Sequence, residues 1–144
     1  MNLYTIGFTK KCAKEFFELL IKNNIKTVID TRLNNKSQLA GFTKQDDFKY
    51  FLEKIGSIKY VYKLEWAPSK EMLDNFKKKK INWEEYKSQY LALLSQRNIT
   101  NGIDFMQLDG ACLLCSEEKP NYCHRRLLAE YLEKSNRNIT IVHL

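Results

Sequence analysis

Two kinds of hydrophobic pattern alternate along this chain. Short apolar stretches rich in β-branched and aromatic residues predict strands at 3–8, 26–30, 57–64, 110–115 and 138–144. Between them, apolar residues recur at helical spacing; these stripes are Ala13, Phe16, Phe17 and Leu20, then Phe48, Phe51, Leu52 and Ile55, then Trp83, Tyr86, Tyr90 and Leu94, and finally Leu127, Leu128, Tyr131 and Leu132. This alternation predicts an α/β fold with a mostly parallel sheet of about five strands and helices on both faces.

Two threonines are placed to begin helices. Thr9 follows the first predicted strand and is expected to cap the first helix. Thr43, with Asp46 three residues later, resembles a capping box ahead of the second helix. The segment with Trp66 and Pro68 is expected to be a loop that leads into the third helical stripe.

The composition fits one domain that spans residues 1–144. Hydrophobic residues make up 44% and charged residues 28%, which is typical of a globular protein. Two prolines and five glycines argue against linkers, and no internal repeat is present. No apolar run approaches the roughly 20 residues that span a bilayer, and the start lacks the pattern of a signal peptide. We therefore expect a cytoplasmic protein with no membrane partner and with reduced cysteines.

The formal net charge of +7 favours anionic partners. Part of this charge lies in runs such as Lys77 to Lys80, which are more typical of a solvated face than of a binding groove. The expected partner is an anionic small molecule or a nucleic acid, and no cofactor is expected.

Polar residues follow several of the predicted strands. In parallel α/β sheets, ligands bind beyond the carboxyl ends of the strands. The residues at these ends are Gly7 and Phe8 after the first strand, Asp30, Thr31 and Arg32 after the second, Cys115, Ser116 and Glu117 after the fourth, and His143 in the last. We therefore expect Arg32, Cys115, Cys123 and His124 to line a common pocket there. Asp30 is expected to form an ion pair with Arg32 or to support it, and Arg32 to face an anion.

The stretch CLLCSEEKPNYCHRRLLAEYL, from Cys112 to Leu132, holds three of the four cysteines and one of the two histidines. One interpretation is a zinc site. Residues three apart on a strand point to opposite faces, so Cys112 and Cys115 are not expected to reach one ion. Cys123 and His124 are neighbours and would diverge by about 100° on a helix. We therefore expect no metal here.

A thiol active site fits the spacing better. If the helix begins near Pro120 or Asn121, Cys123 and His124 lie in its first turn, where free N–H groups and the helix dipole lower a thiol's pKa. Arg125 and Arg126 add positive charge that can hold an oxyanion or a phosphate. A third interpretation is structural, with the cysteines as small buried residues.

These motifs resemble a known family. YTIGFT near the start, VIDTR, LLCSEEKPNYCHRRLLAEYL and the closing IVHL are similar to the family called domain of unknown function 488. The resemblance covers essentially the whole chain, and its most specific part is the Cys…Cys-His-Arg block. It implies an α/β domain with functional candidates at Asp30, Arg32, Cys115, Glu117, Cys123, His124 and Arg125. The family name carries no activity.

The chain departs from the family pattern at two places. Phe8 stands where the family usually has His, and Thr9 where it commonly has Ser, so proton transfer by that position would need another group such as His143. The segment EWAPSKEML also differs from the family's glycine-rich pattern. A more distant analogy is to rhodanese-like domains, which similarly have Asp-x-Arg after an early strand and a cysteine after a later one; fold analogy alone assigns no reaction.

Together these observations predict a thiol-dependent enzyme that acts on a phosphate- or nucleic-acid-containing substrate. Cys123 or Cys115 would be the nucleophile and His124 the acid or base, while Arg125 and Arg32 would hold the anion. Glu117 is a further catalytic candidate, with Arg126 as an anion contact and Thr9 and His143 in support. The alternative is a non-catalytic, basic nucleic-acid-binding or regulatory module with a structural Cys/His cluster.

Overall fold

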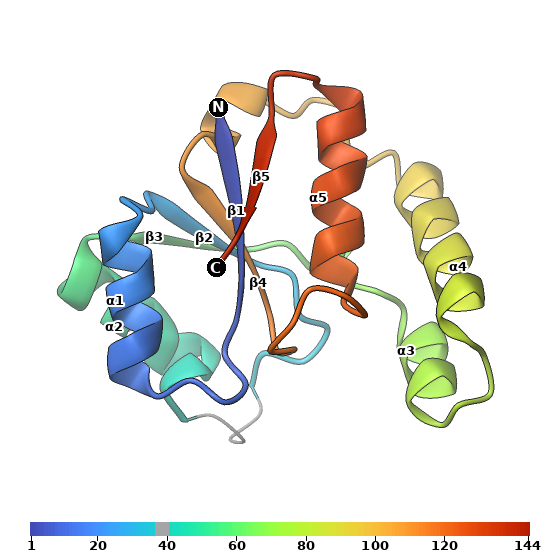
Figure 1. Ribbon diagram of the computed structural model, residues 1–144, viewed down its shortest axis with the longest axis horizontal. Helices are drawn as coiled ribbons and strands as arrows, with labels where there is room; N and C mark the ends of the chain where they lie inside the picture. Colours follow the sequence, from blue (N-terminus) through green and yellow to red (C-terminus); the bar gives the residue numbers. More distant parts are fainter. Residues whose placement is uncertain (37–40) are drawn as a thin grey trace.

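The computed structural model describes residues 1–36 and 41–144. In this part of the chain, five strands form one sheet, and every neighbouring pair is parallel. The strand order is β3-β2-β4-β1-β5, and the bounds are β1 (Asn2–Gly7), β2 (Thr27–Asp30), β3 (Lys59–Tyr62), β4 (Ala111–Cys115) and β5 (Thr140–His143) (Figure 1). The predicted α/β class and the parallel sheet are confirmed.

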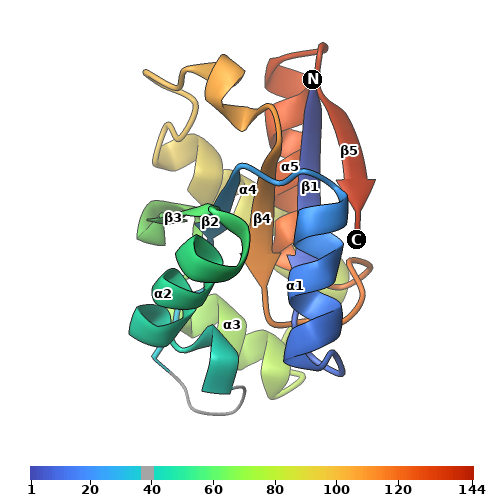
Figure 2. The same ribbon diagram turned by 90° about the vertical axis from the view of Figure 1, so that its left-hand side faces the viewer.

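Helices cover both faces of the sheet (Figures 1 and 2). One face packs against α1 (Ala13–Lys22) and α2 (Gln45–Gly56), and the other against α5 (His124–Ser135), with α4 (Trp83–Gln96) and α3 (Lys70–Lys77) beyond it. Short 3-10 turns occupy Gly41–Thr43, Leu64–Trp66 and Phe105–Leu108. No helix in residues 1–36 and 41–144 combines the length and apolar character that a membrane span requires.

The central strand β4 divides the interior into two cores, because successive side chains of a strand point to opposite faces. Cys112 and Leu114 belong to the core that packs on α1 and α2. Ala111 and Leu113 belong to the core on the α5 side. By the same alternation, Cys115 faces α5, so the predicted separation of Cys112 from Cys115 is confirmed.

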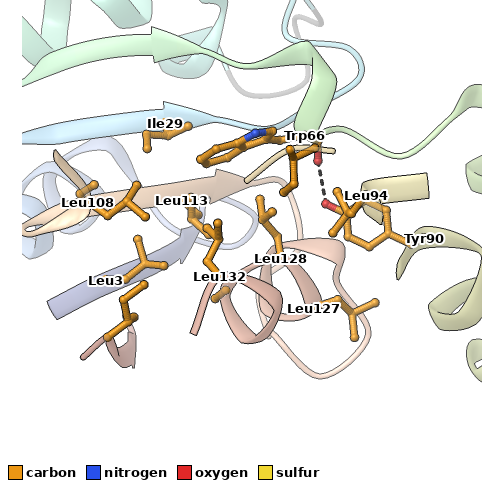
Figure 3. Close-up of a cluster of buried hydrophobic side chains, with 14 of the residues drawn as sticks. Leu3, Ile29, Trp66, Tyr90, Leu94, Leu108, Leu113, Leu127, Leu128 and Leu132 are labelled. Carbon is orange, nitrogen blue, oxygen red and sulfur yellow. Dashed lines mark hydrogen bonds between the residues drawn. The ribbon is translucent and has the colours of Figure 1, made fainter. Parts of the chain in front are cut away.

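The core on the α5 side is the larger of the two. Leu113 of β4 lies at its centre, and the leucines of α5 pack against it from below the sheet in Figure 3. Trp66 closes this core next to α4, where the Tyr90 hydroxyl donates a hydrogen bond of 2.7 Å to the Trp66 carbonyl. Tyr90 thereby fixes α4 beside the first turn of α5.

Three predictions about helix starts were wrong. The last helix begins at His124 with Cys123 as its N-cap, not near Pro120 or Asn121. The other two predictions concern α1 and α2. The first helix begins at Ala13 with Cys12 as its N-cap, while Thr9 lies in the preceding turn. The second begins at Gln45 after Lys44, whose side chain makes no capping bond, and Thr43 belongs to a 3-10 turn. In both cases the chain inserts an additional turn before the helix. The capping box that does form is in α4, between Asn82 and Glu85.

Candidate functional site

Three segments meet at the carboxyl edge of the sheet, as the sequence predicted. β4 ends at Cys115, Thr31 and Arg32 follow β2, and α5 begins at His124 with Cys123 as its N-cap. All five side chains are buried, with exposed fractions between 0% and 6%. Cys115, Cys123, His124 and Thr31 contact one another in a closed cluster, whereas the Arg32 side chain contacts Asp30, Thr43 and Phe8.

The Cys115 sulfur is the centre of this cluster. Its Sγ lies 2.7 Å from the Sγ of Cys123 and 3.7 Å from Nδ1 of His124. The backbone N–H of Glu117 also donates to it. A sulfur that receives donors from several directions is a favourable site for a negative charge.

The N-cap geometry explains how two neighbouring residues both reach Cys115. Cys123 has an extended backbone, with φ of −128° and ψ of 139°, and the helix begins only at His124. We predicted that these two side chains diverge, on the assumption that both lie within a helical turn. That prediction was wrong, because the change from extended to helical backbone at Cys123 brings both side chains to the same sulfur.

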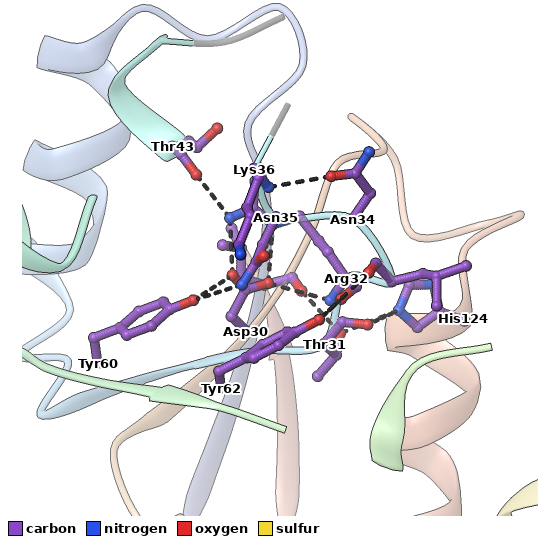
Figure 4. A network of polar contacts seen from close by, with 12 residues as sticks. Asp30, Thr31, Arg32, Asn34, Asn35, Lys36, Thr43, Tyr60, Tyr62 and His124 are labelled. Atoms are coloured by element: carbon purple, nitrogen blue, oxygen red, sulfur yellow. Dashed lines mark hydrogen bonds and ion pairs between the residues drawn. The ribbon is translucent and has the colours of Figure 1, made fainter. Parts of the chain in front are cut away.

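The far side of the His124 ring is held by Thr31. Nε2 lies 2.9 Å from the Thr31 carbonyl oxygen and 3.1 Å from its hydroxyl, and that hydroxyl donates a bond of 2.8 Å to the Leu114 carbonyl (Figure 4). A carbonyl only accepts, so Nε2 carries a proton and Nδ1 faces the sulfur. Nδ1 can then take the Cys115 proton and return it. The ring of Tyr90 lies edge-on to His124, 5.7 Å away between centroids, and packs the imidazole in place.

The pKa values of the three groups move in different directions. Burial alone would raise the pKa of Cys115, but the hydrogen bond from Cys123 and the charge of His124 bring that pKa well below its usual range. Burial and the bond to Cys115 raise the pKa of Cys123. Burial tends to lower the pKa of His124, yet the neighbouring Cys115 raises it overall. These directions of the pKa favour Cys115 over Cys123 as the thiol that ionises.

Arg125 binds the loop that connects Cys115 to Cys123. It is fully buried, and its guanidinium donates to the carbonyl oxygens of Glu117 and Glu118, the second at 3.2 Å. It also lies 3.8 Å from the Cys123 sulfur. A β-carbon on Gly7 would overlap the Glu117 carbonyl, at 1.6 Å, so only glycine lets this loop approach the end of β1. The guanidinium therefore binds groups of the protein itself.

His143 is linked to Arg125 through the Thr5 hydroxyl. Its Nδ1 lies 2.6 Å from the Thr5 hydroxyl, and Nε of Arg125 lies 3.4 Å from the same oxygen. Partial burial and the nearby charges of Arg125 and Arg126 lower the pKa of His143. Phe8, at the position where the family resemblance led us to expect His, packs under the Arg32 guanidinium at 5.3 Å.

Asp30 and Arg32 form a buried ion pair. Arg32 donates to both carboxylate oxygens, at 2.9 and 2.8 Å, and to the Thr43 carbonyl at 2.7 Å. The Tyr60 hydroxyl donates to Asp30 at 2.7 Å, and that of Tyr62 donates to the Arg32 carbonyl at 3.0 Å (Figure 4). Burial and the Asp30 charge raise the pKa of Tyr60. This network fixes the backbone at Thr31, which in turn orients His124.

The remaining candidates lie around the cluster. Glu117 contributes backbone groups, whereas its carboxylate has no contact with Cys115 or His124 among those the structure describes. Arg126 pairs with Glu130 at 2.9 Å and donates to the Asn121 carbonyl. Thr9 donates to the Ser116 carbonyl at 2.5 Å and so connects β1 to the loop after β4. The anion-binding roles of Arg32, Arg125 and Arg126 stay predictions.

Sequence reasoning missed Thr5, Thr31 and Tyr90 as contacts of the site. Thr31 lay within the Asp30-Thr31-Arg32 motif, and its position directly after a buried strand was a usable signal. Thr5 and Tyr90 lie within ordinary strand and helix patterns, so no local feature marked them.

The ligand atoms of Cys115, Cys123 and His124 lie within 4.8 Å of one another, which raises the question of a metal. Two thiolates on a tetrahedral zinc, with Zn–S bonds of about 2.3 Å, are about 3.8 Å apart. The two sulfurs here are 2.7 Å apart. The sulfurs are therefore closer together than two cysteine ligands of one zinc ion would be.

A groove of about 780 Å³ lies away from this cluster, where the amino ends of β2 and β3 face the segment after α4. Its lining includes four cationic and three acidic side chains, Lys26, Lys59, Lys63, Arg97, Glu65, Asp104 and Asp109. With charges of both signs, the groove does not select an anionic ligand.

A comparison with protein families places this cluster in a wider context. The model of the family described as domain of unknown function DUF488 matches residues 12–132, which include Asp30, Arg32, Cys115, Cys123 and His124. The comparisons with curated proteins and with solved structures found no match. Since the matched region covers most of the chain and the whole thiol cluster, the chain belongs to the DUF488 family.

Proposed function

We propose that this protein is a thiol-dependent enzyme in which Cys115 is the nucleophile and His124 its proton partner. The proposal is based on two successive contacts, from Cys115 to His124 and from His124 to Thr31. A nucleophile, a base within reach of it and a third group that orients the base form the arrangement common to enzymes with activated thiols or hydroxyls. His124 would hold the proton of Cys115 and deliver it to a leaving group.

The structure favours Cys115 over Cys123 as the nucleophile. Cys115 accepts hydrogen bonds from Cys123 and from the Glu117 N–H, and its pKa falls, whereas the pKa of Cys123 rises. The thiolate is the reactive form of cysteine. Cys123 is then a donor to the nucleophile in the resting protein.

We further propose that the substrate is anionic, either a small phosphate compound or a nucleic acid. This part of the proposal rests on the net charge of +7. The three arginines near the site bind groups of the protein, so they lend it no separate support. Because Cys115 is only 2% exposed, a bulky substrate requires movement of the segment 116–122.

The pH dependence of alkylation tests the nucleophile. In a Cys12→Ser background, the rate of iodoacetamide labelling at Cys115 should stay nearly constant between about pH 6 and 8, because a thiol with a depressed pKa is already ionised there. In the same protein unfolded in urea, the rate should rise about tenfold per pH unit, as for an ordinary thiol with pKa near 8.5. Peptide mass spectrometry after quenching gives the rate for each cysteine.

His124→Ala should convert the folded-state profile into the steep one, and Lys14→Ala, on the exposed face of α1, serves as the control. A steep profile at Cys115 in the folded wild-type protein would show that its thiol is not activated. It would refute the proposed function and support the structural alternative.

A further inference from the structure

We propose that Cys115 and Cys123 form a two-electron redox couple that reduces a small hydroperoxide, with Cys115 as the attacking and Cys123 as the resolving thiol. This inference rests on the proposed nucleophile, Cys115, and assigns it a small neutral oxidant as a substrate in addition to the anionic substrate. Its basis is the contact between the two sulfurs, which belong to different segments and lie 2.7 Å apart in a closed cluster. A disulfide bond has a length of about 2.05 Å, so oxidation of the two thiols by the hydroperoxide would require only a small further approach of the sulfurs.

The two thiols differ in the way that such a couple requires. Cys115 receives donors and is stabilised as the thiolate, while Cys123 remains protonated and donates to it. Attack by a thiolate oxidises Cys115 first, and Cys123 is then already in place to react with the product. Cys112, on the opposite face of β4, cannot take this part.

Burial determines the size of the oxidant. Cys115 and Cys123 are each 2% exposed, and Arg125 holds the carbonyls of the segment between them. A disulfide substrate has to place its own sulfur in line with Cys115, which this closed loop obstructs. Hydrogen peroxide is close to water in size and needs only a small opening.

The chemical steps balance with the groups present. The Cys115 thiolate attacks one oxygen of hydrogen peroxide, the O–O bond breaks, and the departing hydroxide takes a proton from His124 to become water. Cys115 is then a sulfenic acid. The Cys123 sulfur attacks the Cys115 sulfur and displaces hydroxide, which takes the Cys123 proton and leaves as the second water. A thiol reductant returns both cysteines to the thiol state.

The role of Arg125 follows from its position 3.8 Å from the Cys123 sulfur. In the second step Cys123 loses its proton, and a buried cation beside it favours the developing thiolate. Through its bonds to Glu117 and Glu118, the same guanidinium keeps the loop in the shape that holds the two sulfurs together.

Mass spectrometry of the folded Cys12→Ser protein after exposure to hydrogen peroxide tests the inference. The expected product has lost two hydrogens, and cleavage after Glu117 or Glu118 should leave the Cys115 and Cys123 peptides linked. Cys112 should remain free for alkylation after unfolding. The Cys123→Ser variant should stop at the gain of one oxygen on Cys115, which dimedone traps, and Cys115→Ser should show neither product.

The rate of oxidation separates this chemistry from chance oxidation. His124→Ala should slow the reaction on the order of 100-fold through loss of the proton donor, while Lys14→Ala, on the exposed face of α1, should leave it within about twofold. Faster disulfide formation with oxidised glutathione than with peroxide would overturn the choice of a small oxidant.

Failure of this inference is distinguishable from failure of the proposed function. If alkylation at Cys115 is independent of pH but peroxide gives no Cys115–Cys123 disulfide, the nucleophile stands and the redox couple is wrong. A steep alkylation profile together with no disulfide would refute both. Circular dichroism of each variant shows that its fold is retained.

Discussion

Replacement of Asp30 with alanine is expected to lower the free energy of unfolding by about 3–5 kcal/mol. The carboxylate is fully buried and accepts two bonds from the Arg32 guanidinium, one from the Arg32 backbone N–H and one from Tyr60. Without it, the Arg32 guanidinium is left as an unpaired charge in the interior. Chemical denaturation followed by circular dichroism measures the loss.

Two further variants test whether the loss of stability comes from the unpaired charge of Arg32. Tyr60→Phe removes one hydrogen bond to the same carboxylate and the acceptor of the Asn35 amide, and should cost less, about 1.5–3 kcal/mol. Asp30→Leu combined with Arg32→Met removes both charges and should recover most of the stability lost in Asp30→Ala. A loss below about 1 kcal/mol in Asp30→Ala would mean that the ion pair does not hold this edge of the sheet together.

A comparison of two adjacent arginines gives the second large effect. Arg125→Met should cost roughly 3 kcal/mol or more, because the fully buried guanidinium satisfies the carbonyls of Glu117 and Glu118 and lies beside Cys123. Arg126→Met loses a partly exposed pair with Glu130 and should cost about 1 kcal/mol or less. Both values come from denaturant unfolding.

The same two variants test whether Arg125 holds the segment 116–122, which lies between Cys115 and Cys123. Arg125→Met should speed iodoacetamide labelling of Cys123, since the segment 116–122 is no longer held. Arg126→Met should leave that rate unchanged within about twofold. If the two variants lose equal stability and label equally, Arg125 does not have the positioning role that its contacts indicate.

The architecture could be predicted because hydrophobic periodicity reports burial directly. β4 was recognisable from Ala111 to Cys115 as a continuous apolar run, and every residue of it is buried. Helix starts were less predictable: Thr9 is a good capping residue by type, yet it bonds to the Ser116 carbonyl across the sheet edge. Such a tertiary contact has no local sequence signal.

The site was predictable at the level of segments and not at the level of contacts. Topology alone brought Cys115, Arg32 and His124 to one edge of the sheet. The extended backbone at Cys123 brings both Cys123 and His124 to the Cys115 sulfur, and the helical pattern alone did not predict these contacts. For Arg32 the sequence left open an ion pair with Asp30 or a contact with an anion, and the structure shows the ion pair.

The far-ultraviolet absorbance of thiolates, followed as a function of pH, tests the central claim most directly, because it needs no reagent to enter the closed cluster. We expect the folded protein to keep about one thiolate per chain at about pH 6.5, well below the ordinary thiol pKa near 8.5. This signal should disappear in Cys115→Ser and His124→Ala and persist in Cys112→Ala. If no thiolate absorbs until the pH exceeds about 8.5, or if the signal survives Cys115→Ser, then Cys115 is not an activated thiol.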